Sequence, residues 1–402
     1  MRSILVLTST YPRWKGDTEP AFIHSLCKQL TGRYKVILLA PHYPGAKRRE
    51  ELDGIKVYRF FYSLSAMEHL AYDGGIIQNM KNNRLKYLLV PFFIASQYIM
   101  IVALCRKHRI SLIHAHWLIP QGLSAVLSRY LIPEHIRILC TSHGGDLYSL
   151  LGGSLSAVKR YVLSRSDHVT VVSEAMKSRV LQMGCHPQKV TMQSMGVDLK
   201  NRFTPDGMAT ISTDLIFVGR LVEKKGVSTL VEAVHHLRPE FPELKLTIIG
   251  DGPERYALEK QARTLGIYHQ IDFLGAVPNE RLPDYYRSAR IAIVPSIVAK
   301  DGDQEGLGLV AVEAMGCGCA TVVSNLPALE DVVEDRETGL MFESGNAADL
   351  ADKIRQLLVD ESLRLRLARK GREYVASKFD WEEVGNNYIE IIDKCLTDQA
   401  AA

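Results

Sequence analysis

The sequence predicts an α/β protein with two doubly wound domains, each built on a parallel sheet. Three observations lead to this fold class. Short apolar runs alternate with amphipathic stretches along nearly all of the 402 residues. These runs form two series separated by a polar seam, and a chain of this length ordinarily holds two or three domains. Parallel strands covered by helices on both faces give continuous apolar runs of this kind.

The predicted strands follow the chain in two series. The first series is 4–7, 36–39, 56–60, 112–114, 137–141 and 168–172. The second is 214–218, 245–249, 271–274, 291–295 and 320–323, with helices expected at 228–237, 255–265 and 347–358. The seam near 195–198 predicts domains at 1–196 and 197–380. A last helix begins at Trp381, and we expect residues 381–402 to return and complete the first domain.

Composition excludes several classes of protein. Apolar residues make up 47% and charged residues 23%, which is typical of globular proteins. A formal net charge of +4 does not require nucleic-acid binding. The seven cysteines are scattered without a Cys-x-x-Cys pair, so we expect neither zinc nor disulfides and a reducing, cytoplasmic environment. The short apolar run at the N-terminus is the first strand rather than a secretion signal.

The segment 85–105 is unusually apolar, with Lys86 as its single charge. Its length would allow it to span a bilayer. Pro91, Ser96 and Gln97 interrupt it, and a strand-like run follows at once. We therefore expect a helix that is buried or lies on a membrane surface. The basic residues at its ends, Arg84, Arg106 and Lys107, favour contact with an anionic membrane.

The densest chemical signal lies at 305–315, where Glu305 and Glu313 bracket a glycine-rich turn and an apolar helix. Amides at a helix N-terminus suit a phosphate, and Gly306 and Gly308 allow the backbone to approach it closely. Glu313 would lie about 10 Å farther along the helix, an offset that matches the ribose of a nucleoside diphosphate. Glu305 would face the group on the terminal phosphate. The alternative interpretation is a pair of solvated helix-end acids.

A second set of candidates follows the strand at 214–218. Gly219 ends this strand, and Arg220 and Lys225 come before the next helix. A guanidinium and an ammonium at a strand's carboxyl end can hold an anion, although loop cations are often simply solvated. Gly250 begins another glycine turn between a strand and a helix.

These segments together form an ordered motif set. Gly219-Arg220, Lys225-Gly226, Gly-Asp-Gly-Pro-Glu at 250–254, Phe-Leu-Gly at 273–275, Pro-Ser at 295–296 and Glu305-x7-Glu313 follow one another. The chain resembles the retaining nucleotide-sugar glycosyltransferases of family 4 over essentially its whole length. The resemblance implies the GT-B fold, with two Rossmann-like domains that face each other across a cleft. It also implies an acceptor-side first domain and a donor-binding second domain.

The resemblance further implies roles for residues of the second domain. Arg220 and Lys225, near Gly219 and Gly250, would hold the donor diphosphate. The amides of Gly306, Leu307, Gly308 and Leu309 would support the phosphates. Glu313 would bind the ribose and Glu305 the donor sugar, while residues near Gly275 and Val277 would meet the base.

The first domain carries a matching segment at 141–146, in which His143 would contact the donor sugar near the reaction centre. His114 and His116 resemble a common family segment; read alone, two histidines on one strand face could suggest a metal, but no carboxylate or cysteine lies nearby in the sequence. The loop 11–17 departs from the family. Many members carry a Gly-Gly pair there that lies against the diphosphate, whereas this chain has the single Gly16, which could still serve in that role. Arg13 and Lys15 are candidates for the anion site or solvated loop cations.

The resemblance implies transfer of a hexose from a UDP- or GDP-sugar to a hydroxyl, with retention and without a metal or other cofactor. Asp301 and Asp303 resemble the Asp-x-Asp metal motif of another glycosyltransferase class, but an Asp/Gly turn is the expected interpretation. We expect a lipid-linked or oligosaccharide acceptor in cell-surface polysaccharide synthesis, at the inner membrane face. The alternative is a nucleotide-sugar epimerase or hydrolase, with an acid/base pair drawn from Glu305, His143 and Asp146. A nicotinamide-dependent enzyme is disfavoured because Gly-x-Gly-x-x-Gly is absent after the first strand.

Overall fold

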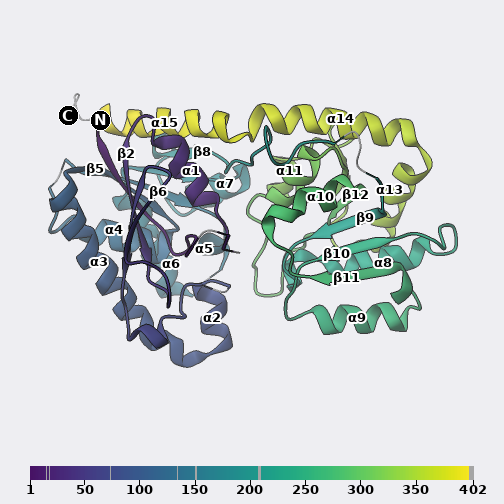
Figure 1. The fold of residues 1–402 in the computed structure, drawn as a ribbon, viewed down its shortest axis with the longest axis horizontal. Coiled ribbons are helices and arrows are strands. Elements are labelled where there is room, and N and C mark those ends of the chain that lie inside the picture. The colour runs from purple at the N-terminus through teal and green to yellow at the C-terminus, as the bar shows by residue number, and fades with distance from the viewer. Residues whose placement is uncertain are drawn as a thin grey trace. The chain divides into compact units, whose positions relative to one another are not determined.

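The structure is a computed structural model that describes residues 1–14, 16–17, 19–72, 74–133, 135–149, 152–206 and 210–397. The chain divides into two compact units (Figure 1). The first comprises Met1–Val172, Met176–Gly196 and Val384–Ala402. The second comprises Ser173–Ala175 and Val197–Glu383. The chain therefore passes from one unit to the other within the polar seam, and again inside its last helix.

The first unit is built on an eight-stranded sheet in the order β3-β4-β2-β1-β5-β6-β7-β8. The strands are β1 (Ser3–Leu7), β2 (Lys35–Pro41), β3 (Arg49–Leu52), β4 (Ile55–Phe60), β5 (Ile110–His116), β6 (Arg137–Ser142), β7 (His168–Val171) and β8 (Val190–Met192). All pairs are parallel except β3–β4. Sequence analysis did not predict β3, whose residues are polar. Asp53 and Gly54 both have positive φ and turn β3 back into β4.

The helices of the first unit are α1 (Phe22–Leu30), α2 (Ile76–Asn82), α3 (Leu89–His108), α4 (Leu123–Ser128), α5 (Gly145–Tyr148), α6 (Gly153–Arg165), α7 (Glu174–Gln182) and α15 (Trp381–Thr397). The unit boundaries pass through α7 and α15. From Val384 onward, α15 packs on the first unit. The Tyr34 hydroxyl donates a 2.7 Å hydrogen bond to Asp393, and a Cβ on Gly385 would lie 2.6 Å from Cβ of Gln29.

Helix α3 is apolar on two faces. It packs against β1, β2, β4, β5 and α4, and it buries Phe93, Ile101 and Leu104. The opposite face is exposed. Among the described residues, the segment 84–108 is the one helix with the length and composition to cross a membrane. Core helices of soluble proteins can have the same length and composition. The helix is thus neither wholly buried nor wholly on the surface.

The second unit is built on a six-stranded parallel sheet in the order β11-β10-β9-β12-β13-β14. The strands are β9 (Thr213–Val218), β10 (Leu246–Ile249), β11 (Ile271–Gly275), β12 (Ala289–Val294), β13 (Ala320–Ser324) and β14 (Leu340–Phe342). The helices are α8 (Val227–Leu237), α9 (Arg255–Thr264), α10 (Leu282–Arg287), α11 (Leu309–Gly316), α12 (Pro327–Glu330), α13 (Ala347–Val359) and α14 (Glu361–Lys378). The strand order reverses between β9 and β12, so the loops that follow these two strands leave the same edge side by side. All seven cysteines of the chain are buried.

Candidate active site

Lys225 and Glu305 form an ion pair at the carboxyl edge of the second sheet. Lys225 ends a short 3-10 turn after β9, and Glu305 precedes α11. The Lys225 Nζ lies 2.5 Å from Oε2 of Glu305. The side chains of Lys225 and Glu305 are only 15% and 14% exposed. Burial would raise the pKa of Glu305, but the lysine charges and the Gly306 amide lower it below its usual value. Glu305 is therefore ionised at neutral pH.

The turn from Glu305 into α11 presents backbone amides. Gly308 is the N-cap of α11 with φ of 85°, and a Cβ there would lie 2.4 Å from Cδ2 of Leu329. Gly306 and Leu307 are buried in the turn, and Leu309 opens the helix. Within the described chain, no side chain caps the first amides of α11. These N–H groups, together with the helix dipole, suit a bound anion.

Glu313 lies one turn into α11, less far along the helix than expected from the sequence, because α11 begins only at Leu309. It faces Tyr286 of α10. The Tyr286 hydroxyl donates a 3.2 Å hydrogen bond to Oε2 of Glu313. Burial raises the pKa of Glu313 to about 7, while the Tyr286 hydrogen bond and the charges of Arg202 and Lys225 limit the rise. Glu313 therefore changes charge near neutral pH. Sequence analysis missed Tyr286 and Arg202, because a tyrosine and an arginine outside any motif carry no local signal.

Three glycines end the neighbouring strands β9, β10 and β11. The Gly219 N–H donates to the Ile249 carbonyl at 2.9 Å, and the Gly250 N–H donates to the Gly275 carbonyl at 2.8 Å. A Cβ on Gly250 would lie 1.9 Å from the Gly219 carbonyl oxygen, so this approach requires glycine. Arg220, next to Gly219, is exposed, and Val277 is partly buried two residues after Gly275. The predicted diphosphate and base residues therefore share one sheet edge.

The turn at 301–303 is held by a lysine. Lys224 Nζ lies 3.1 Å from Oδ1 of Asp303, and the Asp303 N–H donates to Oδ1 of Asp301 at 3.1 Å. In the described part of the chain, no three His, Cys, Asp or Glu side chains are grouped as metal ligands. The pairing with Lys224 favours the interpretation of this segment as a structural turn.

His143 of the first unit is paired with His116, which ends β5. Nε2 of His143 lies 2.9 Å from Nδ1 of His116, and the two rings stack with centroids 5.2 Å apart. Burial lowers the pKa of His143 to about 3 and that of His116 well below its usual value, so both rings are neutral. Among the described residues, Nε2 of His116 has no hydrogen-bond partner.

An orphaned buried N–H costs more than an orphaned acceptor lone pair, so we infer that the His116 proton sits on Nδ1 and is donated to His143. His143 then carries its own proton on Nδ1, where it can donate to a ligand. Asp146 anchors the same loop by accepting hydrogen bonds from the Leu118 N–H at 2.7 Å and the Ser142 hydroxyl at 2.9 Å. These hydrogen bonds indicate that Asp146 holds the loop in place. His143 is then the side chain of this loop that can contact a ligand.

The loop after β1 is organised by an internal ion pair. The guanidinium of Arg13 lies 2.7 Å from Asp17, and the Arg13 N–H also donates to that carboxylate. The Arg13 guanidinium also lies 4.4 Å from the centre of the Tyr43 ring, so both contacts hold it in place within the first unit. Gly16 is exposed with φ of 79°, and Lys15 lies outside the described residues.

Comparison with known proteins adds to this geometry. The family models for glycosyltransferase family 4 and for glycosyl transferases group 1 match residues 21–201 and 209–374. A glycogen synthase of Mycobacterium tuberculosis is 30% identical over 292 residues, which cover 71% of this chain and 69% of the relative. A GDP-mannose-dependent alpha-(1-6)-phosphatidylinositol monomannoside mannosyltransferase of the same species is 30% identical over 271 residues, which cover 64% and 69%.

A solved structure gives the fold independently. HepE of Anabaena, in complex with UDP-glucose, superposes with a TM-score of 0.74 at 17% identity, over 98% of this chain and 100% of that one. Two α/β units with this likeness define the GT-B fold. The chain belongs to glycosyltransferase family 4, as the resemblance in its motifs implied.

Proposed function

We propose that the protein transfers a sugar from a UDP- or GDP-linked donor to an acceptor hydroxyl, with retention and without a metal ion. The observation that carries this proposal is the partly buried Lys225–Glu305 pair beside the uncapped N-terminus of α11. It sets a cation, backbone donors and an ionised carboxylate together, as a diphosphate attached to a sugar would require. The GDP-mannose dependence in one relative's name and the UDP-glucose bound in the HepE structure support the donor class.

Each part of the donor has a proposed partner. Arg220, Lys225 and the amides of residues 306–309 hold the diphosphate. Glu313 accepts hydrogen bonds from the ribose, and residues near Gly275 and Val277 meet the base. Glu305 accepts hydrogen bonds from hydroxyls of the donor sugar. In the first unit, the family resemblance assigns His143 to the donor sugar, and Gly16 is our candidate for the diphosphate in the loop where this chain departs from the family.

The chemical step breaks the bond between the anomeric carbon and the phosphate oxygen. As this bond breaks, the sugar becomes oxocarbenium-like and the leaving diphosphate gains negative charge. Lys225, Arg220 and the α11 amides therefore stabilise the transition state more than the ground state. The acceptor oxygen attacks from the same face, and its proton passes to the leaving phosphate oxygen. The ionised Glu305 offsets positive charge on the sugar and remains unmodified.

For the acceptor we propose a lipid-linked or growing oligosaccharide of cell-surface polysaccharide synthesis, met at the cytoplasmic membrane face. One relative's named acceptor is a phosphatidylinositol mannoside, which supports a lipid. The glycogen synthase relative supports an oligosaccharide. The exposed apolar face of α3 favours the lipid-linked case.

A panel of UDP-, GDP- and ADP-sugars tests the donor and the reaction. Thermal shift should identify one base, and transfer should depend on an acceptor alcohol and survive chelator. NMR of the product should show an unchanged anomeric configuration. Lys225→Ala should lower kcat by about a hundredfold or more, whereas the exposed α9 control Lys260→Ala should not. Sugar release or epimer formation at the same rate without acceptor would instead identify a hydrolase or an epimerase.

A further inference from the structure

The outward face of α3 carries a continuous apolar stripe. Leu88, which ends the 3-10 turn Arg84–Leu88 that leads into α3, is 69% exposed, and Phe92 and Ile99 of α3 are 62% and 64% exposed. Their spacing, completed by Ala95 and Ala103, places them on one side of the helix. Only about a third of the most apolar 18-residue stretch of this helix is buried inside the protein. This fraction is too small for a core helix. The opposite face holds the helix against the sheet.

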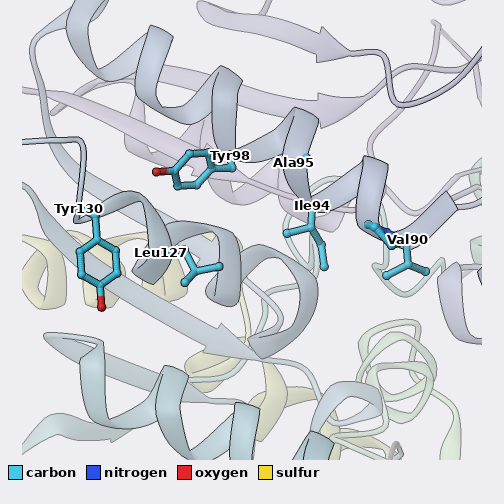
Figure 2. Close-up of a pocket in the computed structure, with 7 residues that line it drawn as sticks. Val90, Ile94, Ala95, Tyr98, Leu127 and Tyr130 are labelled. Atoms are coloured by element: carbon cyan, nitrogen blue, oxygen red, sulfur yellow. The ribbon is translucent and has the colours of Figure 1, made fainter. Parts of the chain in front are cut away.

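The stripe widens into a groove between α3 and α4. Val90, Pro91, Ile94, Ala95, Tyr98, Leu127 and Tyr130 line this groove, whose volume is about 600 Å³. Figure 2 shows Val90, Ile94 and Tyr98 along α3, with Leu127 and Tyr130 on the neighbouring element. Tyr130 and the adjacent Leu131 are themselves 68% and 52% exposed. The lining is almost wholly apolar, apart from the tyrosine hydroxyls, so it suits hydrocarbon rather than a polar ligand.

Charge along the segment that carries the stripe has one sign, although Arg129 at its end is ion-paired with Asp167. Residues 74–133 contain seven Lys or Arg and no Asp or Glu, which is a formal charge of +7. The whole chain sums to +4, so the remaining residues sum to −3. Arg84 lies exposed at one end of the stripe, and Arg106, Lys107 and Arg109 lie exposed at the other. Lys86 contributes less, because its Nζ donates to the His69 carbonyl at 2.9 Å and to Asn79 at 3.2 Å.

We propose that this face, the stripe Leu85–Ala103 with Tyr130 and Leu131, docks on an anionic bilayer. The apolar side chains enter the acyl region while the cations at both ends meet lipid phosphates. The absence of acidic residues along 60 consecutive positions selects a negatively charged partner, and the unbroken apolar stripe selects a hydrocarbon one. The helix lies along the surface because its other face is packed on the sheet. The inference rests on the proposed function only in that a lipid-linked acceptor would be met there.

Flotation of the full chain with vesicles tests the proposal. The protein should float with vesicles that contain phosphatidylglycerol, not with pure phosphatidylcholine, and high salt should release it. The triple variant Leu88→Ser/Phe92→Ser/Ile99→Ser should reduce the bound fraction by about tenfold or more. Its matched control is Val359→Ser/Leu365→Ser, which removes two exposed apolar side chains of the second unit without effect. Arg84→Gln/Arg106→Gln should weaken binding at low salt, whereas the exposed α14 pair Arg366→Gln/Arg369→Gln should not.

Several results would overturn the proposal. The wild type could remain at the bottom of the gradient with anionic vesicles, or the triple variant could float equally well. Sedimentation could show that the wild type is a dimer and the triple variant a monomer, which would make the stripe a subunit interface. Membrane-bound protein that resists salt would indicate a span. Turnover of donor with a soluble acceptor separates this test from the proposed function: the triple variant keeps that turnover if only docking is lost.

Discussion

Glu313 couples donor binding to pH in a way that can be measured. Its pKa is raised to about 7 by burial, and the proposed ribose contact requires the ionised carboxylate. One pH unit below this pKa, deprotonation costs about 1.4 kcal/mol. Donor affinity is therefore complete above about pH 8 and is lost as pH falls through 7. We expect the donor Kd to be about tenfold weaker at pH 6 than at pH 8.

Glu313→Ala should weaken donor binding by about 1–3 kcal/mol at pH 8, the cost of leaving polar partners unmatched. The loss should shrink at pH 6, where the wild-type carboxylate is mostly protonated. The variant should therefore show a flat affinity profile. Tyr286→Phe removes the hydrogen bond that lowers the pKa of Glu313, so its midpoint should move upward.

Isothermal titration calorimetry with an intact nucleotide-sugar is the assay, because such a donor has no group that titrates near neutrality. In two buffers of different ionisation enthalpy at pH 7, the wild type should release about half a proton per donor bound. The control is Glu373→Ala, which changes an exposed acid on α14. Unchanged affinity in folded Glu313→Ala at pH 8, or a wild-type pH profile in that variant, would refute this assignment.

Three further predictions follow from the site. Activity should survive EDTA, because the cations and amides around Lys225 meet the phosphate charge; full loss that Mn²⁺ or Mg²⁺ restores would make Asp301 and Asp303 metal ligands. His116→Leu should lower kcat by about fivefold with donor Kd unchanged, since a hydrogen bond that orients His143 contributes about 1 kcal/mol, and His116→Gln should restore part of the rate. Equal effects on kcat and on donor Kd would instead indicate general damage. Finally, His114 and His116 are fully buried with lowered pKa values, whereas the unfolded chain binds their protons near pH 6.5. The free energy of unfolding should therefore fall as pH drops below 6.5, by up to about 1.4 kcal/mol per pH unit for each histidine, and the melting temperature should fall with it. Burial raises the pKa values of the acids Glu313, Asp146, Glu254 and Asp331, which oppose this trend. A melting temperature that is constant from pH 7 to pH 5 would contradict this account.

Local pattern was sufficient for most elements. The apolar runs at 214–218 and 245–249 became β9 and β10, and the periodic stretch 347–358 became α13. Such runs report burial on both faces of a strand or on one face of a helix, which neighbouring residues determine. Sequence analysis did not predict the polar β3 or the short β14, because these strands form by pairing with β4 and β13 rather than through a pattern of their own.

The motifs also predicted that the candidate site lies at strand ends, because a glycine or a cation directly after an apolar run indicates the loop that follows a strand. What sequence alone could not determine is which of these loops meet. Lys225 and Glu305 are eighty positions apart, and they pair because β9 lies beside β12 in the sheet. Tyr286 reaches Glu313 only through the packing of α10 on α11, and His116 reaches His143 only because β5 and β6 are adjacent.

The exposed face of α3 shows the same division. Composition established that residues 85–105 are apolar and flanked by cations. It could not decide which side of a helix that is apolar all round packs on the sheet, because both sides would gain the same free energy from burial. Tertiary structure decided it: Phe93, Ile101 and Leu104 face the sheet, while Leu88, Phe92 and Ile99 remain in solvent. The local sequence thus determines the chemistry of each side chain. Strand order and helix packing determine which side chains meet, because they bring together residues that are far apart in the sequence.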